Sequence, residues 1–407
     1  MDITNLNSFL KFGYFLNYQN SKLNFDYSLI NKDEYINTPE SELIDLGGRL
    51  WLNVINKNFE LGAKHLVPLS AGLDSRAILG ALLEFTESKN IHTYTFGTPG
   101  TLDYDIGNYI AKKAGTNHSA YPLTEYKYSL SEEIMVSNNI DHQSILFHHP
   151  PFTSLMNKYS DFKIWSGFTG GEQAGSHVLK NPSKNKEEAI INFINKNTYV
   201  KSCNLLNNND SSTGLQTYLS SEMILKSNSI TLDDLFDFNY RQLRYIAPLV
   251  LMHGFNYKTP FLDEEWFSFM MSIPNNFREN QYLYNEILIN SLPKLFKYKT
   301  KNNYGLSLGA NKIRIKVQKG LHYIKSKSSI FTDPYINYID FNEGIRNRKD
   351  LNTIIYSSVM DLKERKIIDW IDIDNIWKRH INKESDHADA LITLASLEIH
   401  LKAGKSL

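Results

Sequence analysis

Residues 64–85, KHLVPLSAGLDSRAILGALLEF, decide the fold that we expect of this chain. An apolar run containing Leu66, Val67 and Leu69 favours a β-strand. The small and polar residues of the segment 70–75 then indicate a tight loop. Apolar residues follow at the spacing that places them on one face of an α-helix: Ile78, Leu79, Leu82 and Leu83. The stretch therefore predicts a strand, a short loop and the N-terminus of a helix.

The loop at 70–75 has the composition of an anion-binding site. The first N–H groups of a helix lack partners within the helix, and the helix dipole favours negative charge there. Gly72 allows a ligand to approach the backbone closely, and Ser70 and Ser75 add hydroxyl donors. Asp74 would repel a phosphate unless a Mg²⁺ ion lay between them. The alternative is an ordinary strand-to-helix turn rich in small residues, and the loop is not a Walker A motif.

Composition bounds the class of protein. The chain has 407 residues, of which 42% are hydrophobic and 22% charged, so it can bury a core over two or three domains, or over one large domain with an appendage. Lys+Arg and Asp+Glu are both 44, which argues against a nucleic-acid binder dominated by phosphate contacts. The single cysteine, Cys203, excludes a disulfide framework. No stretch reaches the roughly 18 apolar residues of a membrane span, so we expect a cytoplasmic enzyme without a membrane span.

The following segments predict a parallel sheet. Residues 91–97 and 117–123 resemble strands, and a helical pattern lies between them. Alternating strands and helices at this spacing build β-α-β units, and ligands of such sheets bind beyond the carboxyl ends of the strands. A further strand at 162–165 precedes the glycine-rich loop 166–172, against which a nucleotide base or ribose could lie; the alternative is a flexible turn. We therefore predict an α/β fold, a parallel twisted sheet flanked by helices.

The remaining chain is predicted to be mainly helical. We expect residues 1–60 to form a leader with a helix, and residues 61–407 to form the main domain, with a helical portion from about residue 215. Residues 125–139 are predicted to be helical, and residues 181–215 to be polar connections between helices.

Three further features carry possible chemistry. The loop 141–152 holds His142, His148 and His149, for which packing or substrate contact is favoured over metal ligation because the spacing is not that of a helical metal site. Arg241 and Arg244 lie three residues apart on a predicted helix, suited to a carboxylate or phosphate, or to ion pairs within the protein. The segment 297–309, KYKTKNNYGLSLG, is a lysine-rich loop.

Six motifs together resemble the synthetase domain of asparagine synthetase-like amide ligases, within the ATP pyrophosphatase (PP-loop) superfamily. In chain order they are LSAGLDSR (69–76), TFGTPGTLDYDIGNYIAKKAG (95–115), SGFTGGEQAGSH (166–177), TPFLDEEW (259–266), KTKNNYG (299–305) and HADALITLASLEIHLK (387–402). The resemblance implies an adenine nucleotide alpha hydrolase-like fold. It also implies that ATP and Mg²⁺ serve to adenylate a carboxylate, and that an amine then displaces AMP to give an amide.

The resemblance assigns roles by motif. The residues for ATP and pyrophosphate would be Ser70, Gly72, Leu73, Asp74, Ser75, Phe96, Ser166 and Gly167. Lys301 matches the catalytic lysine, with Lys299 as the alternative, and Asp74 and Glu172 would bind the metal. The ammonium group of the catalytic lysine would stabilise the charge that accumulates on the α-phosphate in the transition state.

Departures from the family pattern shape the expected reaction. Asp2 stands where the family's glutaminases have cysteine, and the leader is too short for that domain, so we expect no glutamine hydrolysis. The amine would be ammonia, an amine substrate, or ammonia from a separate partner or pathway protein. Gly171 replaces a metal-binding aspartate, Phe168 replaces a frequent acidic residue and Asn256 replaces a glutamate near the acceptor site. Asparagine is therefore not the expected product.

The expected substrates are a small-molecule or peptide carboxylate and an amine, used for a specialised metabolite, a modified peptide or a surface sugar. Gly171 and Asn256 also motivate a second hypothesis, a non-catalytic relative that binds a nucleotide or a partner protein. A third hypothesis is an adenylating tRNA-modifying enzyme. It has no support, because the chain has neither an excess of basic residues nor a CxxC pair. The sequence leaves open the acid, the amine, the ammonia source, the oligomeric state and the effect of Gly171.

Overall fold

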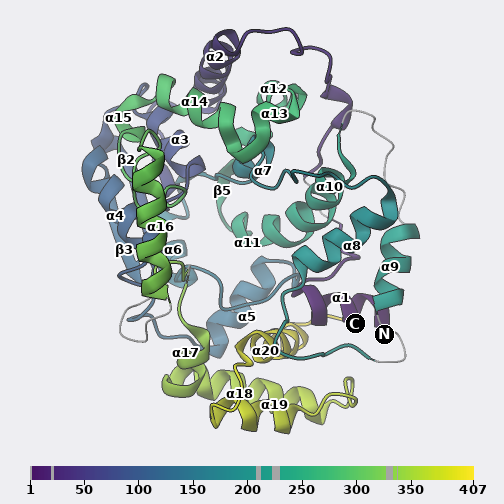
Figure 1. Ribbon diagram of the computed structural model, residues 1–407. Helices are drawn as coiled ribbons and strands as arrows, with labels where there is room; N and C mark the ends of the chain where they lie inside the picture. The colour runs from purple at the N-terminus through teal and green to yellow at the C-terminus, as the bar shows by residue number, and fades with distance from the viewer. Residues whose placement is uncertain (1, 20–22, 208–211, 222–229, 327–332, 337) are drawn as a thin grey trace.

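The computed structural model describes residues 2–19, 23–207, 212–221, 230–326, 333–336 and 338–407. Its centre is a five-stranded sheet in which all neighbouring strands are parallel. In the order β3-β2-β1-β4-β5, the strands are Asn117–Pro122, Ile91–Gly97, His65–Pro68, Lys163–Trp165 and Asn256–Lys258. Helices flank this sheet, and further helices form the C-terminal part of the chain (Figure 1). The predicted α/β class is confirmed.

The helices have the following bounds: α1 Ile3–Phe12, α2 Glu40–Asn58, α3 Asp74–Leu82, α4 Leu102–Ala114, α5 Leu130–Asn139, α6 Phe152–Tyr159, α7 Gly170–Ala174, α8 Lys186–Asn197, α9 Ser212–Ser221, α10 Leu232–Phe236, α11 Ala247–Val250, α12 Glu264–Ser272, α13 Asn275–Arg278, α14 Tyr282–Ser291, α15 Pro293–Phe296, α16 Lys312–Ser326, α17 Phe341–Asn347, α18 Lys349–Glu364, α19 Ile373–Ile381 and α20 Ala388–Lys402. A π-helix, Asp237–Ile246, joins α10 to α11.

Burial on both faces of the sheet explains the apolar run of β1. Leu66 packs with residues of α6, whereas Val67 packs with residues of α3 and α4 on the other side. Successive side chains of a strand point to opposite faces, so a strand covered on both sides needs apolar residues at consecutive positions. The sheet is therefore the middle layer between two helical layers.

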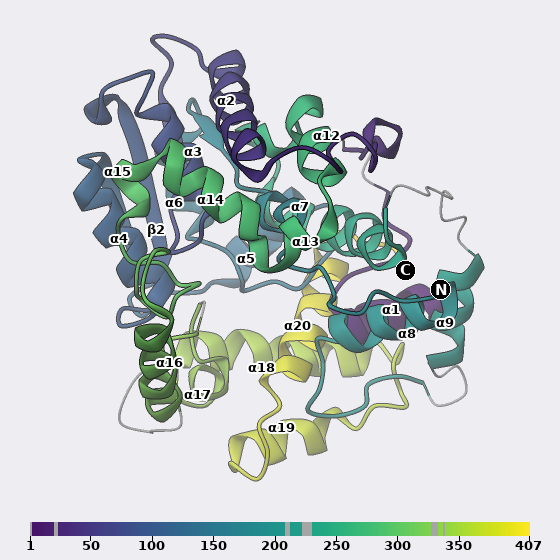
Figure 2. The same ribbon diagram turned by 45° about the horizontal axis from the view of Figure 1, so that its top comes forward.

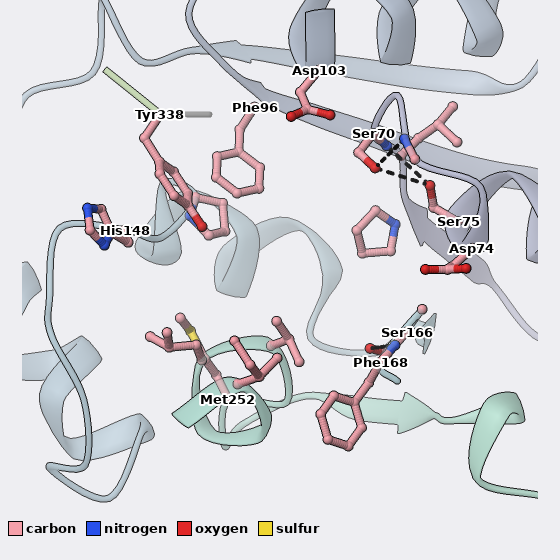
Figure 3. Close-up of a pocket in the computed structure, with 18 of the residues that line it drawn as sticks. Ser70, Asp74, Ser75, Phe96, Asp103, His148, Ser166, Phe168, Met252 and Tyr338 are labelled. Atoms are coloured by element: carbon pink, nitrogen blue, oxygen red, sulfur yellow. Dashed lines mark hydrogen bonds between the residues drawn. The ribbon is translucent and has the colours of Figure 1, made fainter. Parts of the chain in front are cut away.

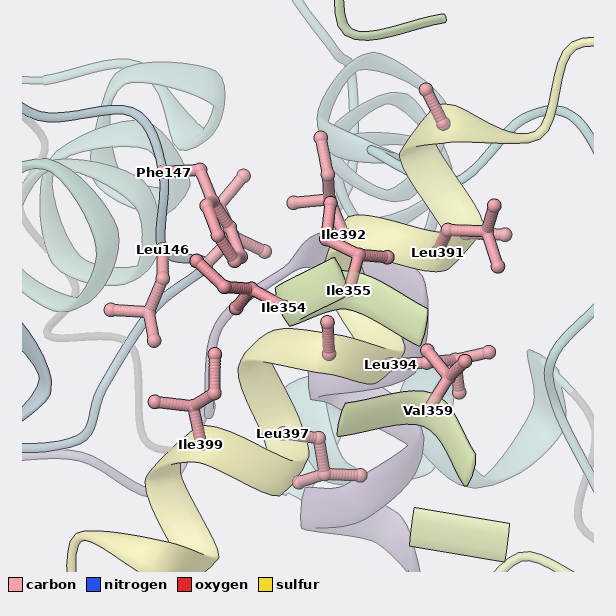
Figure 4. Packing of buried hydrophobic residues seen from close by; sticks show 14 of the residues in the cluster. Leu146, Phe147, Ile354, Ile355, Val359, Leu391, Ile392, Leu394, Leu397 and Ile399 are labelled. Atoms are coloured by element: carbon pink, nitrogen blue, oxygen red, sulfur yellow. The ribbon is translucent and has the colours of Figure 1, made fainter. Parts of the chain in front are cut away.

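A second core lies beneath the sheet, among α1, α5 and α17–α20 (Figure 2). Helix α20 is buried almost all round, which explains why its sequence is apolar without a strong polar face. Its leucines and isoleucines pack against Ile355 and Val359 of α18 (Figure 4). The leader contributes to this second core through α1, which contacts α20. It also contributes to the core at the sheet through α2, which contacts α14.

Three local expectations need correction. The segment 181–215 was expected to be polar connections, but α8 occupies Lys186–Asn197 and buries four apolar side chains: Ala189, Ile190, Phe193 and Ile194. Helix α5 begins at Leu130 rather than near residue 125, because the Ser129 hydroxyl accepts from the Glu132 N–H and caps the helix there. The three-residue strand β5 was not predicted. Residues 208–211, part of the expected connection, lie outside the described residues.

Among the residues that the structure describes, no helix combines the length and the apolar character needed to cross a membrane.

Candidate functional site

The strand order places a crevice between β1 and β4. The chain leaves β1 for β2 and β3 on one side and later returns to β4 and β5 on the other side. Ligands of open α/β sheets bind at such a switch point, outside the carboxyl ends of the strands. The loop after β1, residues 69–73, and the loop after β4, residues 166–169, both lie at this edge. The two glycine-containing loops predicted from the sequence are therefore brought together.

A cavity of about 820 Å³ opens at this edge (Figure 3). The predicted residues that line it come from both loops, from the starts of α3 and α7, from β2 and from the π-helix: Ser70, Gly72, Asp74, Ser75, Phe96, Ser166, Gly167, Glu172 and Arg241. The other predicted residues are not among those lining it: Leu73, Arg244, Asn256, Lys299 and Lys301. Leu73 is buried in the apolar core beneath α3.

Hydrogen bonds within the first loop arrange its hydroxyls around the start of α3. The Gly72 N–H donates to Ser70 Oγ at 3.1 Å, and the Ser70 N–H donates to Ser75 Oγ at 3.3 Å (Figure 3). Among the described residues, no side chain caps the N-terminus of α3. The first N–H groups of that helix are therefore left for a ligand in the cavity.

Asp74 lies where the two loops meet. Glycines of the second loop and of the start of α7 approach it closely. An added Cβ at Gly170 would stand 2.7 Å from the Asp74 Cγ, and one at Gly167 would stand 3.0 Å from the Asp74 Cβ. The Tyr284 hydroxyl donates to Asp74 Oδ1 at 3.1 Å. Burial, with a smaller contribution from the Glu172 charge, raises the pKa of Asp74 to about 7. These glycines are thus needed to let a carboxylate sit between the loops.

Asp74 and Glu172 fit the requirements of Mg²⁺ in a phosphate site. Mg²⁺ is commonly held by one or two carboxylates, several waters and the oxygens of substrate phosphates. The described ranges contain no group of three or more His, Cys, Asp or Glu residues that could hold a metal ion. The pair could therefore hold Mg²⁺ together with a bound phosphate rather than as a complete protein cage.

The lysine-rich loop 297–309 docks on the first loop. The Lys301 N–H donates to the carbonyl of Ala71 at 3.3 Å, and the Lys301 ammonium pairs with the carboxylate of Asp103. Asp103 lines the cavity, so the Lys301 ammonium lies next to one of the lining residues. The Lys299 ammonium instead lies 4.6 Å from the centroid of the Tyr109 ring. The two candidate lysines therefore occupy different places: the Lys301 ammonium pairs with a residue that lines the cavity, whereas the Lys299 ammonium lies over Tyr109.

Arg76, which the sequence analysis did not single out, holds that loop in place. Its fully buried side chain donates to the carbonyl of Lys299 at 2.8 Å and to that of Tyr298 at 3.5 Å. Burial lowers the pKa of Arg76 to about 10. The sequence signal was an arginine within the first turn of an otherwise buried helix.

The TPFLDEEW segment packs against α7, the helix that follows the second loop. The Gln173 side-chain amide donates to the carbonyl of Phe261 at 2.7 Å, and a Cβ at Gly170 would meet the Phe261 ring at 2.8 Å. Asp263 caps α12 by accepting from the Glu265 N–H. The described contacts of this segment are therefore structural.

The two arginines of the π-helix differ in their surroundings. Arg241 lines the cavity, whereas the Arg244 guanidinium lies 4.4 Å from the centroid of the Tyr240 ring and within 3.5 Å of the Tyr218 hydroxyl. Asn256 is exposed at the amino-terminal end of β5, the end of the sheet away from the two loops. Of the three predicted substrate residues, the structure brings Arg241 alone to the cavity.

The three histidines of the loop 141–152 lie in separate environments. His149 forms a buried pair with Glu133 at 3.0 Å, and the Glu133 charge raises its pKa despite burial. His142 hydrogen-bonds Ser137 at 2.9 Å. His148 lines the cavity and stacks on Tyr338. These contacts agree with packing or substrate contact rather than a shared metal.

Comparison of the sequence with protein-family models and with curated proteins finds no match.

The raised pKa of Asp74 predicts a pH-dependent stability. Between about pH 4 and pH 7 the folded state keeps a proton that the unfolded state releases, so this group lowers stability as pH rises through that interval. Asp74→Asn removes the effect. The quantity to compare is the free energy of unfolding of Asp74→Asn minus that of the wild type, measured without divalent ions. We expect this difference to be roughly 2 kcal/mol greater at about pH 8 than at about pH 5. Urea unfolding of both proteins measures this, and an equal difference at both pH values would contradict it.

Proposed function

We propose that this chain is an ATP-dependent, AMP-forming carbon–nitrogen ligase of the asparagine synthetase-like kind. The observation that carries the proposal is the meeting of three distant segments, two of which line one cavity while the third docks on the first of them. These are the loop after β1, the loop after β4, and the lysine-rich loop, in which the Lys301 N–H donates to the Ala71 carbonyl. The resemblance assigned these same segments to pyrophosphate, AMP and catalysis.

In the proposed first step, an oxygen of the substrate carboxylate forms a bond to the α-phosphorus of ATP. The bond between that phosphorus and the bridging oxygen breaks, and pyrophosphate leaves. The N-terminus of α3 and the hydroxyls of Ser70 and Ser75 bind the pyrophosphate oxygens. Mg²⁺ held by Asp74 and Glu172 would neutralise phosphate charge. The AMP moiety occupies the space beside Phe96, Ser166 and Gly167.

In the second step, the nitrogen of an amine or of ammonia bonds to the acyl carbon. AMP leaves, and the nitrogen loses a proton. The Lys301 ammonium supports the first step by stabilising charge on the α-phosphate, where its contribution is greater in the transition state than in the ground state. Its ion pair with Asp103 keeps it at the rim until a phosphate competes for it.

A second function, a non-catalytic nucleotide- or partner-binding protein, is favoured by one observation. Gly171 leaves Asp74 and Glu172 without a third acidic neighbour among the described residues. This alternative predicts ATP binding without pyrophosphate release, or no ATP binding. Exchange of pyrophosphate into ATP separates the two functions because it requires reversible adenylation.

We expect Mg²⁺-dependent ATP–pyrophosphate exchange in the presence of the correct carboxylate, found by testing panels of acids with and without amines. Lys301→Ala should lower the exchange rate about 100- to 1,000-fold, because it removes a cation that faces the developing charge. Lys299→Ala should lower it less than about threefold, since that ammonium lies over Tyr109.

Thermal unfolding of both variants controls for misfolding. Equal losses in the two folded variants would contradict the assignment of Lys301. Binding of ATP with no exchange under any condition would instead support the non-catalytic function.

Gly171→Asp tests the metal site. An added Cβ there would stand 3.3 Å from Ser176 Oγ, which must shift slightly, and 3.5 Å from Asp74 Oδ2, so a side chain at this position begins beside the Asp74 carboxylate. We expect the Mg²⁺ concentration for half-maximal exchange to fall at least about fivefold, because a further anionic ligand joins the site. Gly171→Asn, which has the same shape without the charge, is the matched control.

A second readout does not need turnover. Without Mg²⁺, Gly171→Asp should unfold at a lower temperature than Gly171→Asn, because like charges repel, and added Mg²⁺ should reverse that order. Identical responses of the two variants to Mg²⁺ would show that Gly171 does not adjoin a metal site.

A further inference from the structure

The cavity extends well beyond the phosphate-binding loops into a second region, which we call the aromatic chamber. Its walls include His148, Tyr199, Tyr245, Leu249, Met252 and Tyr338. In Figure 3, His148, Tyr338 and Met252 lie across the cavity from Ser70, Asp74 and Ser75. A volume of about 820 Å³ in total leaves room for a second molecule beside a nucleotide.

Four of these six wall residues carry aromatic rings, and Leu249 and Met252 add apolar side chains. Tyr338 stacks on His148, with ring centroids 4.8 Å apart and an interplanar angle of 17°. The centroids of the Tyr338 and Phe96 rings are 6.0 Å apart. Tyr199 meets the edge of the His148 ring. Burial lowers the pKa of His148 to about 3, so its ring is neutral at physiological pH. Such walls favour an apolar or aromatic molecule over a polar one.

Arg241 gives the chamber one positive charge. Among the described residues that line the cavity, the other charged ones are acidic: Asp74, Asp103 and Glu172. Within the part of the chain that the structure describes, Arg241 forms no hydrogen bond or ion pair. Against the effect of burial, the charges of His177 and Arg241 lower the pKa of the nearby Asp237 carboxyl. The hydrogen bonds of that carboxylate come from His177 at 2.9 Å and from Gln242 at 3.0 Å. The guanidinium is therefore available to an anionic group of a ligand.

We propose that the aromatic chamber binds a substrate with an apolar or aromatic body, and that Arg241 pairs with an anionic group of that substrate. The inference rests on the proposed function, because it names the class of acid that would lie beside ATP in the same cavity. Examples of the class are hydrophobic N-acylated amino acids and peptide ends with a free carboxylate. A small polar acid would leave the aromatic walls unfilled.

Binding of three probes without ATP tests the inference by isothermal titration calorimetry. The probes are N-acetylphenylalanine, its neutral primary amide, and N-acetylglycine, which keeps the acid but lacks the apolar body. We expect N-acetylphenylalanine to bind at least about tenfold more tightly than either of the others.

Variants of the two arginines assign the charge. Arg241→Gln should weaken binding of N-acetylphenylalanine at least about tenfold and leave the amide unchanged, and Arg241→Lys should recover part of the loss. Arg244→Gln, three residues along the same helix and outside the cavity lining, should change both affinities less than about twofold. Thermal unfolding checks that each variant is folded.

The outcomes separate this inference from the proposed function. Equal binding of acid and amide, equal effects of the two glutamine variants, or no binding of any probe would overturn the inference. Selective binding without ATP–pyrophosphate exchange in any assay would keep the inference and count against the ligase. Exchange with small polar acids alone would keep the ligase and overturn the aromatic chamber as its substrate site.

Discussion

The site depends on one half-buried carboxylate, that of Asp74. Removing a charge from water is costly, and the cost appears here as a pKa raised to about 7. The glycines of the second loop and the Tyr284 hydroxyl allow the carboxylate to lie between the ends of β1 and β4. Structures that hold an acid in so unfavourable a position usually use it, and a metal ion beside a phosphate would relieve its cost.

The rest of the molecule can be understood as support for that position. The sheet order creates the crevice, and α3 presents its N-terminus to it. Arg76, buried behind the first loop, holds the backbone of Lys299 and so fixes the segment that carries Lys301. Residues more than 200 positions apart in sequence therefore meet around one cavity, whose polar end suits phosphates and whose aromatic chamber suits an apolar partner.

The sequence predicted four of the five strands and the two loops because their signals are local: apolar runs, followed by serine and glycine at strand ends. It missed α8, since polar residues around the helix masked four apolar positions at helical spacing. The sequence could not show that Arg241 lines the cavity while Arg244 and Asn256 do not. Which side chains line a cavity depends on how distant helices and strands pack. The roles of Arg76 and Tyr284 likewise arise from contacts between segments far apart in the chain.

The most direct test is a crystal structure of the protein with Mg²⁺ and an ATP analogue that has a carbon bridge between the α- and β-phosphates. The account predicts the β- and γ-phosphates at the N-terminus of α3, the metal ion against Asp74, and the adenosine between Phe96 and Ser166. The Lys301 ammonium should have left Asp103 for the α-phosphate. A nucleotide bound elsewhere, or none in the cavity at saturating analogue, would contradict the account.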